Sequence, residues 1–369
     1  MRLSPLVLAV LSVPAVAQSP IYPSPSGGTG VLGRSYIFAG STGLDHASQL
    51  VVPIFAGMPI GRQFFLDVTS NYALTEVEGT NGVVERLDGF TDTQLRGTLT
   101  LGRDVAVLSV SINLPTGVAT VEQDQLTVLG NTAQTFLPFA VANYGSGFGA
   151  TSGLALARPF GAWNLGIAGA VRYLDGYQPI AGVSGEYKPG VEGRVRLGVD
   201  RLLGERGRVT FGVTWSNFGT DEFAGQVQSG AYSYRPGARF IAEAGYARQV
   251  GRSTVHGYGW AYFRQDGRTT DSVGSSLSGA ENLYDLGLML VTPIGTRVVL
   301  DPGLDVRVWY PDGHYAGYLV LLRVGARFRV GDLWSLAPAV AWGDGWTTTS
   351  QGSGTVTGWS ANLMLRIGR

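Results

Sequence analysis

The residues best suited to bind a solute are charged side chains that recur at every second position of short apolar runs. Glu192, Arg194 and Arg196, for example, alternate with glycine, valine and leucine. This alternation puts charged side chains on one face of a β-strand and apolar ones on the other. The charged positions that the pattern singles out as candidate lumen or constriction residues are Arg96, Arg194, Arg196, Arg239, Asp285, Asp305, Arg307, Arg323 and Arg327.

Catalytic and metal-binding patterns are absent from the sequence. The three histidines, His46, His256 and His314, lie far apart, there is no cysteine, and no Gly-x-Ser-x-Gly motif occurs. A zinc site built from cysteine and histidine therefore has no ligands at a usual spacing. His256 shares a strand face with Tyr258 and Trp260 and is interpreted as an interface residue. The sequence predicts no enzyme, no metal site and no cofactor.

The composition is that of a chain with many turns and few solvated faces. It has 55 glycines, 11% aromatic residues and 15% charged residues, whereas soluble domains carry about 25% charged residues. Beyond the N-terminus no uncharged apolar run reaches the ~18 residues of a transmembrane helix. Any membrane crossing must therefore use strands. The net charge of zero gives no reason to expect a nucleic-acid partner.

The N-terminus has the features of a secretory signal peptide. Residues 1–17 contain one arginine, a short apolar segment and the ending Ala15-Val16-Ala17, which predicts cleavage before Gln18. A retained membrane anchor is the alternative, but the apolar segment is short and holds two prolines. Residues 18–30 are expected to form a Pro/Gly-rich periplasmic leader or a short plug, and residues 31–369 the barrel.

A hairpin unit recurs along the rest of the chain. In residues 91–114 an alternating run, a turn at Gly102-Arg103-Asp104 and a second alternating run follow one another. Short turns are predicted at 58–62, 102–104, 159–162, 203–207, 250–252, 293–296 and 330–333, and longer loops near 40–46, 79–90, 115–145, 174–188, 219–233, 267–280, 310–314 and 344–355.

This alternation of turns and loops predicts an all-β fold, a transmembrane antiparallel up-and-down β-barrel of about 14–16 strands. The short turns would face the periplasm and the loops the outside. A soluble β-sandwich or propeller is the alternative, but the charged faces need a wet interior. Tyr258, Trp260 and Tyr262, on one face of one strand, are predicted to belong to an interfacial aromatic girdle, together with Trp309, Tyr310, Trp342, Trp346 and Trp359.

The third loop is long and unusually apolar. It is expected to fold into the lumen, where it narrows the passage or walls a ligand pocket; a lid over the rim is the alternative. Residues 122–129 are expected to form one or two helical turns. The candidate ligand-wall residues are Leu126, Leu129, Phe136 and Phe139. The arginines and aspartates either hold the barrel in shape as ion pairs or form a path that favours anionic or polar solutes.

Two segments, FTDTQLRGTLTLGRDVAVLSVSINLPTG at 90–117 and GSGFGATSGLALARPFG at 145–161, resemble the FadL-type and phenol-degradation-type outer-membrane channels over about a third of the chain. The resemblance implies a monomeric barrel that passes small hydrophobic molecules. FadL-type barrels have fourteen strands and an N-terminal hatch inside the lumen, whereas this chain has about sixteen predicted strands and a short leader. No individual binding residue is carried over.

The expected function is passive diffusion of small hydrophobic or amphipathic molecules across the outer membrane. The alternatives are a non-transporting surface barrel, structural or adhesin-like, and a general porin. The expected partners are outer-membrane lipid, a small-molecule solute and the barrel-assembly machinery, while the oligomeric state stays open. The last residue is Arg369, where barrels usually end on an aromatic residue that the assembly machinery recognises.

Overall fold

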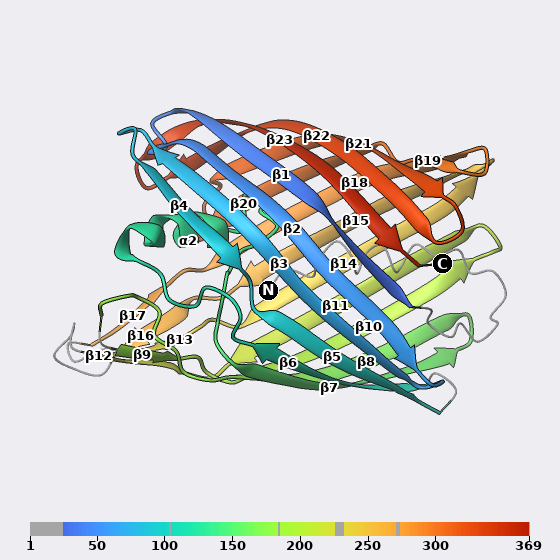
Figure 1. The fold of residues 1–369 in the computed structure, drawn as a ribbon, viewed down its shortest axis with the longest axis horizontal. Coiled ribbons are helices and arrows are strands. Elements are labelled where there is room, and N and C mark those ends of the chain that lie inside the picture. Colours follow the sequence, from blue (N-terminus) through green and yellow to red (C-terminus); the bar gives the residue numbers. More distant parts are fainter. Residues whose placement is uncertain (1–24, 103–104, 184, 226–231, 271–273, 369) are drawn as a thin grey trace.

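The chain forms one closed antiparallel β-barrel. A computed structural model describes residues 25–102, 105–183, 185–225, 232–270 and 274–368. The strands are tilted relative to the barrel axis, a short helix lies inside the barrel, and a group of small strands lies at one end (Figure 1). The expected signal peptide at 1–17 and the terminal Arg369 lie outside the described residues.

Closure is made by the first and last strands, which pair from Gly27 with Ile367 to Gly40 with Gly354. Within the described residues the wall has 18 strand segments; β4 continues into β5 and β19 into β20, which gives sixteen strands. The wall segments are β1 (Ser26–Gly40), β2 (Leu44–Ile60), β3 (Phe64–Gly79), β4 (Val84–Phe90), β5 (Thr93–Leu101), β6 (Ala106–Leu114), β7 (Gly149–Phe160), β8 (Trp163–Leu174), β10 (Glu192–Leu203), β11 (Gly207–Phe218), β14 (Arg239–Val250), β15 (Ser253–Arg264), β18 (Glu281–Ile294), β19 (Val298–Leu300), β20 (Gly303–Pro311), β21 (Gly317–Val330), β22 (Trp334–Thr349) and β23 (Gly352–Ile367).

The turn end of the barrel is built on glycine, and six of the seven predicted short turns are confirmed. In the seventh, at 102–104, Gly102 is a turn residue, and residues 103–104 lie outside the described residues. Each of the seven segments carries a glycine with φ between +59° and +76°, a conformation that glycine adopts without steric cost. These glycines, within the described residues, are Gly61, Gly102, Gly161, Gly204, Gly251, Gly295 and Gly331. Turn chemistry was therefore the most readable signal in the sequence.

The loop end differs from the prediction where the strands of the wall are longer than expected. Residues 40–46, 79–90 and 344–355 are mostly strand, because β1–β4, β22 and β23 extend beyond their neighbours and meet in tight turns. The same lengthening corrects the predicted leader, since β1 begins at Ser26 and takes in residues 26–30. The wall is thus tallest where these long strands lie side by side.

An apolar belt surrounds the outside of the barrel. On β22 it runs along the outward positions from Trp334 to Trp342, and Asp344 lies just beyond it. Trp342 pairs directly with Trp359 of β23, and both rings are about half exposed, at 55% and 49%. An apolar band flanked by aromatic side chains is the lipid-facing surface of an outer-membrane barrel. The girdle prediction is therefore confirmed for Trp342 and Trp359.

The girdle prediction is wrong for β15. Tyr258, Trp260 and Tyr262 face the lumen: Tyr258 donates a hydrogen bond to Asp305, and Trp260 lies opposite Asp285. His256 shares that face. The outward positions of this strand include Gly257, Gly259 and Ala261, and the side chain of Leu286 on the neighbouring strand lies over Gly259. Alternation showed that the rings share a face but not which face was outside.

A second, five-stranded sheet lies at the loop end (Figure 1). Its strands are β9 (Gly185–Lys188), β12 (Asp221–Gly225), β13 (Tyr232–Arg235), β16 (Gly267–Thr270) and β17 (Ser275–Ser278). Its strands belong to the three loops that connect β8 to β10, β11 to β14 and β15 to β18. Within the described residues no helix is long and apolar enough to cross a membrane.

Candidate functional site

The loop of residues 115–148 folds into the barrel, as expected. It contains the predicted helical turns, a 3-10 turn η1 (Gln123–Gln125) followed by α2 (Leu126–Ala133). Its apolar side chains pack on inward residues of β1–β4, β21 and β23 to form the hydrophobic core of the molecule. We call this segment the inner loop. Burial of apolar surface on the inside of the tall wall fixes it there.

The four predicted ligand-wall residues fall into two groups. Phe136 and Phe139 are 1% and 0% exposed and belong to the hydrophobic core, so the prediction that they line a ligand space is wrong. Leu129 packs against the same core, and Leu126 is 38% exposed. Phenylalanine is the residue expected to anchor such a segment, because its large apolar surface is removed from water on packing.

Gln49 of β2 binds the inner loop much as a neighbouring strand would. Its Oε1 accepts from the backbone N–H of Ala140 at 2.8 Å and of Val141 at 2.9 Å, and its Nε2 donates to the carbonyl of Val141 at 2.7 Å. The side chain is 2% exposed. One glutamine thus satisfies three backbone groups of the loop, which could not be left unpaired without a cost in free energy.

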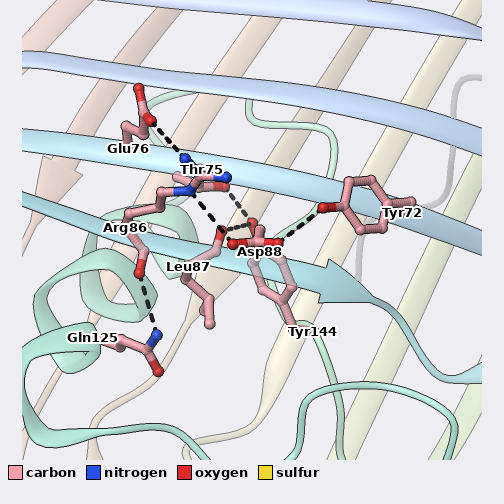
Figure 2. A network of polar contacts seen from close by, with 8 residues as sticks. All are labelled: Tyr72, Thr75, Glu76, Arg86, Leu87, Asp88, Gln125 and Tyr144. Carbon is pink, nitrogen blue, oxygen red and sulfur yellow. Dashed lines mark hydrogen bonds and ion pairs between the residues drawn. The ribbon is translucent and has the colours of Figure 1, made fainter.

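Tyr144 continues this network into β3 and β4. Its hydroxyl lies 2.5 Å from Thr75 Oγ1 and donates to the carbonyl of Leu87 at 3.1 Å; Figure 2 shows these contacts beside that of Gln125, which donates to the carbonyl of Arg86. Burial raises the pKa of the Tyr144 phenol to about 12, although the hydrogen bond with Thr75 opposes the shift. The loop is therefore docked with Tyr144 neutral.

The opposite edge of the inner loop is held by a buried ion pair. Arg307 of β20 binds Asp285 of β18 at 2.5 and 2.9 Å, and its remaining nitrogen donates to the carbonyls of Thr135 and Phe136 at 3.2 Å. Beside it, Glu281 accepts hydrogen bonds from Thr135 and from the Trp309 indole. The loop thus bridges the inward faces of β2–β4 and of β18–β20.

All nine predicted charged residues point into the lumen, on the face opposite the apolar belt. The expected cross-strand pairing on β18–β21 is confirmed for Asp285 with Arg307. Further contacts join Arg96 to Asp67 at 2.9 Å, Arg194 to Glu192 at 2.5 Å, Arg196 to Glu243, Arg323 to Asp301 at 3.6 Å, and Asp305 to Tyr258. In the described part of the chain no carboxylate lies within 4.0 Å of Arg239 or Arg327.

The other side of the lumen is lined by small side chains. On β7 and β8 the inward positions include Ala155, Ala168 and Ala170, each partly exposed. The inward alanines under the loop, Ala47 and Ala73, are 0% exposed. The same residue type is thus covered on one side of the barrel and open on the other, so the inner loop fills only part of the lumen.

The aromatic column on β15 lies between these two sides. Tyr258, Trp260 and Tyr262 occupy successive inward positions, and the Arg307 guanidinium lies 5.7 Å from the centre of the Trp260 ring. An arginine over an aromatic face is an attractive arrangement for apolar rings and for anions alike. Sequence reasoning missed Gln49, Tyr144 and this column as parts of the site.

Catalytic chemistry has little support in this arrangement. Among the described residues no group of three or more histidine, aspartate or glutamate side chains is placed to hold a metal ion. Most arginines and carboxylates of the lumen bind one another, whereas Arg239 and Arg327 have no carboxylate within 4.0 Å among the described residues. Such a surface can orient a solute and bias its charge.

Comparisons with known proteins return solved structures only. No family model and no curated protein matches the chain. Similar structures include the P. putida toluene transporter TodX (10% identity, TM-score 0.47, 95% of this chain and 91% of that chain) and a Pseudomonas aeruginosa FadL homologue (9%, 0.47, 94% and 90%). An anion-selective porin from Comamonas acidovorans is also similar (12%, 0.43, 93% and 98%). At these identities and TM-scores the likeness carries no information about what crosses this barrel.

Proposed function

We propose that the chain is an outer-membrane channel through which small amphipathic molecules diffuse passively. The passage is the part of the lumen that the inner loop leaves open. It is bounded by the small residues of β7 and β8, by the arginines of the neighbouring strands β10 and β14, and by the aromatic column of β15. None of these walls carries a group that would react with a solute.

The observation that carries the proposal is the contrast between the two sets of inward alanines. Ala47 and Ala73 are completely covered by the inner loop, whereas Ala168 and Ala170 keep contact with solvent. A barrel that served only as a surface scaffold would gain stability by filling its interior on both sides.

The passage can be tested with single thiols, because the sequence contains no cysteine. Ala168→Cys places a thiol on the inward face of β8, and Ile167→Cys places one on the outward face at the adjacent residue, where the side chain is 50% exposed. Each variant is refolded, inserted into a planar bilayer and treated with a negatively charged methanethiosulfonate while single-channel current is recorded.

We expect a stepwise, lasting loss of current with Ala168→Cys and none with Ile167→Cys, since the charged reagent does not enter lipid. If mass spectrometry shows that the thiol at residue 168 is labelled but the current does not change, the conducting path lies elsewhere. No current in the wild-type protein or in either variant would leave the scaffold as the function. A large current that passes solutes of every charge equally would favour the general porin.

A further inference from the structure

A row of arginines crosses the lumen wall at the loop end. Strand register places Arg194 opposite Ser216, Ser216 opposite Arg239, and Arg239 opposite Arg264. All of these residues occupy inward positions. We call Arg194, Arg239 and Arg264 the arginine row. Two of its members, Arg239 and Arg264, face each other directly on paired strands, an arrangement that is destabilising for like charges.

The carboxylates nearby do not balance the charge of this row. Glu192 is shared by Arg194 at 2.5 Å and Arg172 at 4.0 Å, and Glu281 binds Arg264 at 3.2 Å while also accepting from Trp309. Among the described residues, the three arginines of the row therefore have two carboxylates within 4.0 Å, Glu192 and Glu281, and Arg239 has none. Repulsion within the row would be relieved by an anion from outside the protein.

Arg239 is the member with unused binding capacity. Its guanidinium lies over the ring of Phe218, with Cζ 4.6 Å from the ring centre. Among the described residues its Nε is buried and has no hydrogen-bond partner. The two terminal nitrogens of a guanidinium can bind a carboxylate through two parallel hydrogen bonds.

Aromatic surface begins directly below the row. Tyr262 and Trp260 follow Arg264 at successive inward positions of β15, about 7 Å apart along the strand. Ile241 occupies the next inward position below Arg239 on β14. A ligand whose carboxylate meets the arginine row would therefore lay its apolar part on aromatic rings. Ring stacking adds a preference for a planar aromatic body over an alkyl chain.

A similar row occurs at the turn end of the lumen. Arg329 lies opposite Ser335, and Ser335 lies opposite Arg366. Within the described residues the Nε of Arg366 is buried and also has no hydrogen-bond partner. Anions are therefore favoured at both ends of the passage, so a solute drawn in at one end is not rejected at the other.

We propose that the solutes of this channel are small aromatic carboxylates, whose carboxylate binds the arginine row and whose ring lies on Tyr262 and Trp260. This inference rests on the proposed function, because a solute bound in the lumen can be transported only if the lumen is an open passage. The proposal requires a carboxylate on the solute, a ring on the solute and an open passage, and the experiment tests each of these separately.

The test uses block of single-channel current by benzoate, benzyl alcohol, benzylamine and hexanoate, added to the refolded full-length protein. The variant is Arg239→Gln, which breaks no ion pair among the described residues, since no carboxylate lies within 4.0 Å of Arg239. The matched control is Arg96→Gln, which removes a lumen arginine of β5 whose charge is already neutralised by Asp67 at 2.9 Å.

We expect benzoate to interrupt the wild-type current at lower concentration than the other three compounds, and to need about tenfold more in Arg239→Gln but not in Arg96→Gln, as expected for loss of a charge-assisted hydrogen bond. Equal block of wild type and Arg239→Gln, or stronger block by benzylamine, would overturn the carboxylate site. Equal block by hexanoate and benzoate would overturn the preference for a ring.

The failure of the proposed function has a different signature. If the wild-type protein gives no current and liposomes containing it take up neither benzyl alcohol nor benzoate, the channel itself is refuted. If it conducts and takes up benzyl alcohol, but benzoate binding does not depend on Arg239, only the arginine-row site is refuted.

Discussion

Replacing Gln49 with methionine should release the inner loop from the wall. Methionine keeps the length of the side chain but cannot bind the N–H groups of Ala140 and Val141 or the carbonyl of Val141, which Gln49 holds at 2.7 to 2.9 Å. A buried backbone group without a partner costs about 1–3 kcal/mol. Three such groups, taken at the lower limit, weaken docking by about 3 kcal/mol.

The opening can be followed with Val141→Cys as the sole thiol, since the sequence has no cysteine and residue 141 is 5% exposed in the docked loop. The hydrogen bonds to Gln49 are made by the backbone of residues 140 and 141, so the substitution retains them. In the limit where the loop opens and closes faster than the thiol reacts, the labelling rate is proportional to the open population. A loss of about 3 kcal/mol then raises the rate by about 100-fold.

The control is Gln94→Met, the same chemical change at an inward position of β5. Among the described residues the Gln94 side chain makes no hydrogen bond, so labelling of residue 141 should keep its original rate. Heat modifiability on gels verifies that each variant remains a folded barrel. An unchanged labelling rate in Gln49→Met, with the barrel intact, would refute the idea that Gln49 holds the loop.

Two further predictions concern the other anchors of the inner loop. Arg307→Met leaves Asp285 buried without its partner and should lower the free energy of unfolding by about 3–5 kcal/mol. Changing Asp285 to Leu in the same chain should restore most of the lost stability. Denaturant titration of the two single variants and the double variant measures this, and strictly additive losses would contradict the pairing. Burial raises the pKa of Tyr144 to about 12 from a usual value of about 10, so docking is at full strength below pH 10 and weakens as pH rises toward 12. Labelling of Val141→Cys, corrected for the reactivity of a free thiol, should accelerate in that window, and Tyr144→Phe should lose the pH dependence; the same slope in both proteins would argue against the phenol.

The sequence determined the local features of this protein. Alternation of apolar and polar residues fixed the strands, and glycines such as Gly161 and Gly251, which turns require at positive φ, fixed where the strands reverse. The charges of Arg194 and Arg239 fixed the polar face of their strands, because arginine cannot face lipid without a large cost. Local chemistry is sufficient for these conclusions, since each depends on only a few neighbouring residues.

Only the tertiary structure decided which face of β15 is inside and what the inner loop binds. Tyr258, Trp260 and Tyr262 suit either lipid interface or lumen, and their side is set by the register with β14 and β18. Phe136 and Phe139 could wall a pocket or fill a core, and the choice depends on residues of β1 and β20 that are more than 90 positions away along the chain. Docking of the inner loop brings Gln49 to Val141, and closure of the barrel brings β1 beside β23. No property of a short segment specifies such pairs, because they are set by how sixteen strands share one register.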